Sequence, residues 1–179
     1  MNLPNKITIF RVLMIPVFVL FMLYDVIPYH YYIASAIFII ACLSDFFDGY
    51  IARKYHLITN FGKFMDPLAD KLLVSSALIC FVELQLMPSW MVIIIIAREF
   101  IISGFRLVAS DNGVVIAASW WGKLKTNVQM VMSVMLIINL DYPFINVLEQ
   151  IAIWLAIALT VISLIDYMIK NKNVLKEKH

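Results

Sequence analysis

Apolar residues fall in six long runs along the chain, and short polar breaks separate the runs. They cover about residues 7–24, 31–52, 67–86, 89–108, 124–140 and 145–169. Each run is close to the roughly 20 residues that an α-helix needs to cross the hydrocarbon core of a bilayer. None alternates between apolar and polar residues with period two, which disfavours a membrane β-barrel. The pattern therefore predicts an all-α membrane protein with six transmembrane helices.

The composition agrees with a membrane protein and excludes several other classes. Of the 179 residues, 63% are hydrophobic and 15% are charged, and a soluble domain of this size cannot hide so much apolar surface. The chain has only two cysteines, which is too few for a disulfide scaffold. The net charge of +2 gives no argument for a nucleic acid partner. There is no internal repeat, and residues 1–179 are expected to form a single polytopic domain.

The charges predict how the helices are oriented in the membrane. All fourteen lysines and arginines lie at one end of the predicted helices, whereas the opposite loops carry acids such as Asp25 and Asp141. Positive charge marks the cytoplasmic side of a membrane protein, so both termini are expected in the cytoplasm. The N-terminus shows no cleavable signal pattern, and the first helix is expected to be retained. Such a short chain suits a bacterial inner membrane.

Four aspartates are clustered at the cytoplasmic ends of the second and third predicted helices. They occur with small residues and one arginine in a single stretch: Asp45, Asp48, Gly49, Ala52, Arg53, Gly62, Asp66 and Asp70. At about 100° per residue, the two acids and two small residues of the second helix fall within an arc of about 100°. The other two aspartates are i,i+4 neighbours. A tight hairpin would bring the two acidic faces together.

Four carboxylates at the membrane edge require compensating positive charge. A single charged residue at the bilayer centre costs about 2.5–3.5 kcal/mol on insertion scales, and mutual repulsion adds to that cost. Two divalent cations would balance the four negative charges, and ligation by carboxylates alone favours Mg²⁺ or Mn²⁺. The alternative is that these acids are interfacial anchors paired with Arg53, Lys63 and Lys71.

The small residues beside the acids allow a bulky ligand to approach the backbone closely. Metal ions next to a floor of glycine and alanine suit a pyrophosphate group, whose oxygens bridge the metals. At the cytoplasmic interface, such a ligand can be a nucleotide-activated lipid with its acyl chains in the bilayer.

The same residues match the pattern D-x2-D-G-x2-A-R-x8-G-x3-D-x3-D at every specified position. In this the chain resembles the CDP-alcohol phosphotransferase family. The resemblance implies six membrane helices, a homodimer, two divalent cations, and transfer of a phosphatidyl group from CDP-diacylglycerol to an alcohol with release of CMP. It implies that Asp45, Asp48 and Asp66 are metal ligands and that Asp70 is both a ligand and the general base. It further implies that Gly49, Ala52, Arg53 and Gly62 bind the nucleotide.

Three other segments resemble a branch of this family that uses sn-glycerol 3-phosphate as the acceptor. They are residues 3–11, 97–107 and 122–129. A phosphorylated acceptor needs cations that do not serve the metal site, and the region of about 98–126 supplies Arg98, Arg106, Lys123 and Lys125. Membrane orientation alone also requires some positive charge there. Glu99 is expected either to orient a neighbouring arginine or to neutralise it.

The first helix opens with a polar strip formed by Asn5, Thr8 and Arg11, which fall within an arc of about 120°. We expect Asn5 and Thr8 to contact the CDP moiety and Arg11 to contact the acceptor phosphate. The alternative is an amphipathic helix start that lies at the membrane surface.

The same sequence features are compatible with other functions. Serine or inositol phosphate can replace glycerol 3-phosphate in the same chemistry. A divalent-cation transporter also requires clustered acids, although it favours a position near the bilayer midplane. A purely structural membrane protein leaves the arrangement of glycine, alanine and aspartate unexplained.

Overall fold

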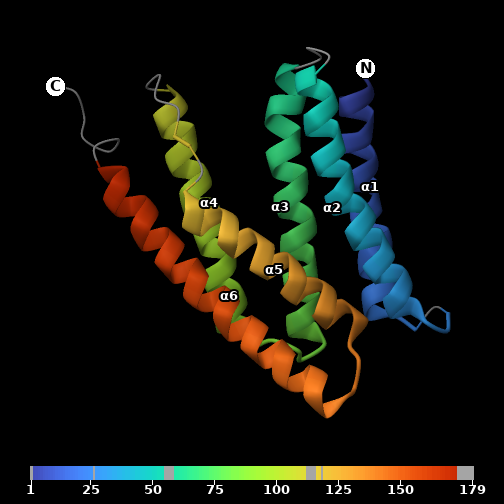
Figure 1. Ribbon diagram of the computed structural model, residues 1–179. Helices are drawn as coiled ribbons and strands as arrows, with labels where there is room; N and C mark the ends of the chain where they lie inside the picture. The colour runs from blue at the N-terminus through green and yellow to red at the C-terminus, as the bar shows by residue number, and fades with distance from the viewer. Residues whose placement is uncertain (1, 26, 55–58, 112–115, 118, 173–179) are drawn as a thin grey trace. The chain divides into compact units, whose positions relative to one another are not determined.

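The computed structural model describes residues 2–25, 27–54, 59–111, 116–117 and 119–172, and for residues 3–4, 45–53, 60–61 and 63–64 it describes the backbone alone. Within these ranges the chain forms six α-helices (Figure 1). They are α1 (Leu3–Leu23), α2 (His30–Lys54), α3 (Asn60–Glu83), α4 (Ser89–Asp111), α5 (Trp120–Ile138) and α6 (Pro143–Lys170). The prediction of an all-α protein with six long helices is confirmed for the described part of the chain.

The helices belong to two compact units. The first unit comprises residues 1–86 and 134–139, and the second comprises residues 87–133 and 140–179. Helix α5 contributes its larger part to the second unit and its last turn to the first.

In the first unit, α1 packs against both α2 and α3 (Figure 1). Phe18 of α1 and Phe38 of α2 are fully or almost fully buried, with ring centroids 5.8 Å apart. On α3 the buried residues include Ala69, Leu73 and Ala77, which recur every fourth position. The two alanines on this face let neighbouring helices approach closely, as small residues commonly do where membrane helices associate. The packing sets the polar start of α1 against the start of α3.

In the second unit, α4 packs against α6. Ile102 and Phe105 of α4 form a buried cluster with Tyr167 of α6, and the two aromatic rings meet edge to face at 6.1 Å. This contact anchors the half of α4 that follows Arg98 and Glu99.

Helix α3 starts earlier than the apolar run indicates. The run begins at Pro67, and a residue before proline resists helical geometry. In the structure Pro67 lies inside α3, and the helix starts at Asn60 because Thr59 caps it: the Thr59 side chain accepts a hydrogen bond from the Gly62 N–H at 3.0 Å. The extra turns place Gly62 and Asp66 on one face of the same helix.

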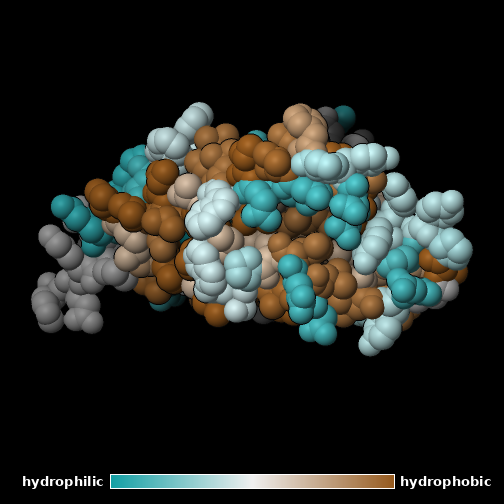
Figure 2. All heavy atoms as spheres, turned by 90° about the horizontal axis from the view of Figure 1, so that it is seen from below, coloured by the Kyte–Doolittle hydropathy of each residue, from teal (hydrophilic) through white to brown (hydrophobic). Residues whose placement is uncertain are grey.

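Many large apolar side chains face outward. Leu13, Ile93 and Phe144 are all more than half exposed, and hydrophobic surface lies beside hydrophilic side chains in the space-filling view (Figure 2). Among the described residues, two helical segments are long and apolar enough to cross a membrane, Asn5–Leu23 and Pro143–Lys170. The intervening helices carry more charged residues, including Asp66 and Asp70 on α3 and Arg98 and Glu99 on α4. The charges that interrupt these helices are also the candidate functional groups.

Candidate active site

The polar strip of α1 is buried inside the first unit. The relative exposures of Asn5, Thr8 and Arg11 are 7%, 0% and 1%. A helix start lying at the membrane surface would leave these side chains accessible, so the strip faces protein. Since α1 packs on α3, these residues are available to organise the acidic end of α3.

Thr8 connects this strip to the aspartate signature. Its hydroxyl donates a hydrogen bond of 2.6 Å to Oδ1 of Asp66, which lies 58 positions away in the sequence. A hydrogen bond to a carboxylate is short and strong because the acceptor is charged. It fixes the orientation of Asp66 and leaves the second oxygen for another partner. The structure thus brings a predicted nucleotide contact and a predicted metal ligand together.

Asn5 and Gly62 meet at the same helix start. The Thr59 hydroxyl donates to Oδ1 of Asn5 at 2.9 Å while it caps α3. A Cβ atom added to Gly62 would lie 3.2 Å from that Asn5 oxygen, 3.3 Å from the Thr59 hydroxyl and 3.5 Å from Oδ2 of Asp66. Packing therefore explains the glycine at position 62, because a larger residue would prevent the start of α1 from approaching α3 so closely. The nucleotide contact expected of Gly62 stays a prediction.

Asp66 and Asp70 occupy successive turns of α3, and both are partly buried. Carboxylate oxygens held on one helix face, with a neighbouring hydroxyl that orients one of them, are a donor set that fits a hard divalent cation. Asp66 and Asp70 are therefore compatible with the predicted metal site, and their role as metal ligands stays a prediction.

The other half of the predicted centre lies near the end of α2. Its residues are Asp45, Asp48, Gly49, Ala52 and Arg53, and their backbone is helical. Their side chains lie outside the described part of the structure, and their roles stay predictions.

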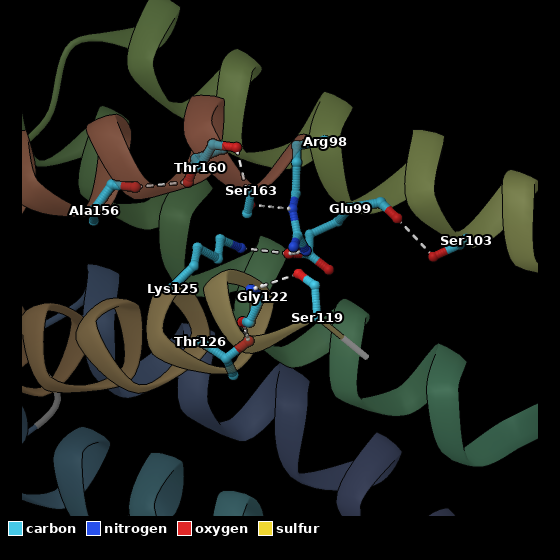
Figure 3. Close-up of polar contacts among 10 residues, drawn as sticks. All are labelled: Arg98, Glu99, Ser103, Ser119, Gly122, Lys125, Thr126, Ala156, Thr160 and Ser163. Atoms are coloured by element: carbon cyan, nitrogen blue, oxygen red, sulfur yellow. Dashed lines mark hydrogen bonds and ion pairs between the residues drawn. The ribbon is translucent and has the colours of Figure 1, made fainter. Parts of the chain in front are cut away.

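Two of the predicted acceptor cations meet in the second unit at Glu99 (Figure 3). Arg98 Nη1 donates to Oε1 of Glu99 at 2.9 Å, and Lys125 Nζ of α5 donates to the same oxygen. Arg98 and Lys125 are both buried, with exposures of 7% and 1%. Two cations and one carboxylate give the group a net charge of +1. Burial strengthens electrostatic interactions, so this group is suited to holding an anion.

Two further contacts fix the Arg98 guanidinium. Its Nε donates to Oγ of Ser163 at 3.1 Å, and the Ser163 hydroxyl donates in turn to the Thr160 carbonyl of α6 at 3.0 Å (Figure 3). A Cβ atom on Gly122 would lie 3.3 Å from Nη2 of Arg98. Gly122 therefore leaves room for the guanidinium beside α5.

The remaining predicted acceptor cations are placed differently. Arg106 and Lys123 are exposed and lie outside the group centred on Glu99. Arg11 is buried in the first unit. Their contact with an acceptor phosphate stays a prediction.

Thr59 and Ser163 also belong to these sites, and neither was predicted from the sequence. A threonine just before a helix is a common N-cap. Thr59 could have been predicted as a cap only if the helix had been expected to start before Pro67. Ser163 had no such signal, because a serine in an apolar helix is compatible with many positions.

Comparison with known proteins assigns the chain to a family. The sequence profile described as CDP-alcohol phosphatidyltransferase matches residues 1–162, and the chain belongs to this family. Among curated relatives, the CDP-diacylglycerol--glycerol-3-phosphate 3-phosphatidyltransferase of Bacillus subtilis is 46% identical, with coverage of 98% of this chain and 97% of the relative. The protein of the same name from Haemophilus influenzae is 42% identical over 93% and 91% of the two chains. A Mycobacterium tuberculosis relative, named "Probable phosphatidylglycerophosphate synthase", is 42% identical over 93% and 80%.

The hydrogen bond between Thr8 and Asp66 generates a direct prediction about cation binding. The T8V variant keeps the shape of the side chain but removes the donor that orients Asp66. If Asp66 is a metal ligand, as the sequence predicts, loss of this outer contact should weaken metal binding about 10- to 100-fold. We expect this increase in the Kd for Mn²⁺, measured from the electron paramagnetic resonance signal of the free ion. The T8S variant retains the hydroxyl and should bind Mn²⁺ like the wild type. Equal affinity of T8V and wild type would show that Thr8 does not orient a ligand.

Proposed function

We infer that this protein is an enzyme that transfers the phosphatidyl group of CDP-diacylglycerol to sn-glycerol 3-phosphate, giving phosphatidylglycerophosphate and CMP. The family and the names of its relatives support this reaction. The reaction belongs to anionic phospholipid synthesis.

The observation that carries the choice of acceptor is the buried group of Arg98, Glu99 and Lys125. Its net charge of +1 matches an acceptor that itself carries a phosphate. A neutral alcohol or a zwitterion such as serine gains much less from two buried cations. The guanidinium is also positioned in advance by Ser163, and preorganised donors are more effective than mobile ones.

Two divalent cations, Mg²⁺ or Mn²⁺, are proposed as cofactors. Asp66 and Asp70 supply oxygen ligands from α3, and Asp45 and Asp48 are proposed to supply the others from α2. Bound there, the cations would stabilise negative charge on the pyrophosphate as CMP leaves. The oxygen-only donor set of the described residues and the Thr8 hydrogen bond support this proposal.

The protein's own groups then have distinct tasks. Arg98 and Lys125 hold the acceptor phosphate. Asp70 accepts the proton of the acceptor's 1-hydroxyl as that oxygen bonds to the phosphorus bearing diacylglycerol, and the phosphoanhydride bond to CMP breaks. An aliphatic hydroxyl is a weak nucleophile at neutral pH, and a positioned base typically contributes about 10²- to 10⁴-fold.

The nucleotide is proposed to lie along the small residues of α2 and the start of α3. Gly49, Ala52, Arg53 and Gly62 would contact the CDP moiety, with Asn5 and Thr8 at the adjoining end of α1. Asn5 and Thr8 are buried against the start of α3, and this supports placing them beside the nucleotide.

The enzyme is proposed to cross a bacterial inner membrane six times, with both termini and the active site at the cytoplasmic face. The loops at residues 24–29, 84–88 and 139–142 carry no lysine or arginine, and this asymmetry supports the arrangement together with the exposed apolar side chains. A homodimer is proposed from the resemblance to the family.

A panel of acceptors tests the proposed reaction. Purified protein receives CDP-diacylglycerol, Mg²⁺ or Mn²⁺, and one of sn-glycerol 3-phosphate, serine, inositol phosphate or glycerol, and CMP release is measured. We expect release with sn-glycerol 3-phosphate and little with the others. Release with serine or inositol phosphate alone would assign a different acceptor. If the protein transports cations into vesicles and consumes no CDP-diacylglycerol, it is a cation transporter and not the proposed enzyme.

Asp70 should contribute more to turnover than to lipid binding. The D70N variant retains the size of the side chain but cannot accept the proton, and we expect kcat to fall about 100-fold or more. The Kd for CDP-diacylglycerol should change much less, as measured by binding of the labelled lipid. A large loss of lipid binding with unchanged kcat at saturation would exclude Asp70 as the base.

A further inference from the structure

Helix α5 carries a line of buried polar side chains that begins at the proposed phosphate site. Lys125, Gln129 and Ser133 recur every fourth residue and therefore lie on one face of the helix. Their exposures are 1%, 4% and 1%. Lys125 is accounted for by its bond to Glu99. The other two have no role in the reaction described above.

Gln129 is the informative member of this line. Within the described part of the chain, its Oε1 atom is buried and accepts no hydrogen bond. A serine hydroxyl such as that of Ser133 can rotate toward a carbonyl of its own helix. The oxygen of a glutamine amide cannot donate a hydrogen bond to a carbonyl of its own helix in this way. A buried polar atom without a partner is costly. The side chain is therefore poised for a ligand or a water molecule.

The functional groups of the acceptor indicate which ligand group Gln129 receives. Under the proposed function, the phosphate of sn-glycerol 3-phosphate is held by Arg98 and Lys125, and the 1-hydroxyl is the nucleophile. One polar group of the acceptor, the 2-hydroxyl, is then left without a partner. We propose that Gln129 is a specificity-determining residue that hydrogen-bonds the 2-hydroxyl of the acceptor while Lys125 holds its phosphate.

The spacing along α5 fits this assignment. Four residues correspond to a rise of about 6 Å, which is comparable to the length of a short phosphorylated three-carbon chain. A hydroxyl both donates and accepts, so it can pair with either end of the glutamine amide. The proposal rests on the proposed function and adds a residue that distinguishes glycerol 3-phosphate from acceptors without a hydroxyl at this carbon.

A pair of acceptors tests the proposal without altering the protein. The phosphate monoester of 1,3-propanediol keeps the phosphate and the reacting primary hydroxyl but lacks the 2-hydroxyl. We expect the wild type to use sn-glycerol 3-phosphate with a kcat/KM about 10- to 100-fold higher, the range expected when a buried polar group loses its partner. If CMP is released with sn-glycerol 3-phosphate but the wild type does not distinguish the two acceptors, the role of Gln129 is overturned while the proposed function stands. If neither acceptor releases CMP, the proposed function itself fails.

Substitution of Gln129 links the preference to this side chain. The Q129L variant should lose the advantage of sn-glycerol 3-phosphate and use the propanediol ester about as well as the wild type does. The N127L variant is a matched control, because Asn127 is an exposed amide on the same helix, and it should retain the preference. An equal loss with both acceptors in Q129L would assign Gln129 a structural role, and an undiminished preference would exclude it from the acceptor site. Q129M provides a second variant of similar volume with the same expected outcomes.

Discussion

A charge buried among apolar helices must have a partner, and this constraint organises the second unit. Arg98 and Lys125 come from different helices, and both donate to one oxygen of Glu99. Breaking such a buried pair by removing one partner is strongly destabilising, because the other charge remains buried. The contact with Ser163 extends the arrangement to α6. Three helices are thus held around two cations, and in the proposed enzyme the excess positive charge binds the phosphate of the acceptor.

In the first unit, hydrogen bonds stabilise the buried polar groups around Asp66. Thr8 supports Asp66, and Thr59 joins Asn5 to the start of α3. The absence of a side chain on Gly62 allows α1 to approach this helix start. The Thr8 hydroxyl reduces the cost of placing the Asp66 carboxylate near a membrane, and in the proposed enzyme the cations that the carboxylates bind reduce it further.

The sequence predicted the helices well because long apolar runs are a strong signal of membrane helices. It was less informative where local and tertiary effects compete, as at Pro67, where the cap provided by Thr59 extends the helix beyond the apolar run. Burial was also hard to anticipate. Arg98 and Arg106 occur in one motif, yet Arg98 is buried and Arg106 is exposed, since packing against α6 decides which face of α4 is covered. The partner of Arg98 on α6 depends on tertiary structure, and no local pattern around Ser163 indicates it.

The central claim is that buried cations recognise the phosphate of the acceptor, and equilibrium binding tests it most directly. Labelled sn-glycerol 3-phosphate would be titrated against the protein in lipid nanodiscs, for the wild type and for the K125M and K170M variants. Lys170 is an exposed lysine paired with Asp166 near the end of α6 and serves as the control. The account predicts saturable binding that inorganic phosphate displaces and glycerol does not, with affinity at least about 10-fold weaker in K125M and unchanged in K170M. Displacement by glycerol as effective as that by phosphate, or wild-type affinity in K125M, would contradict it.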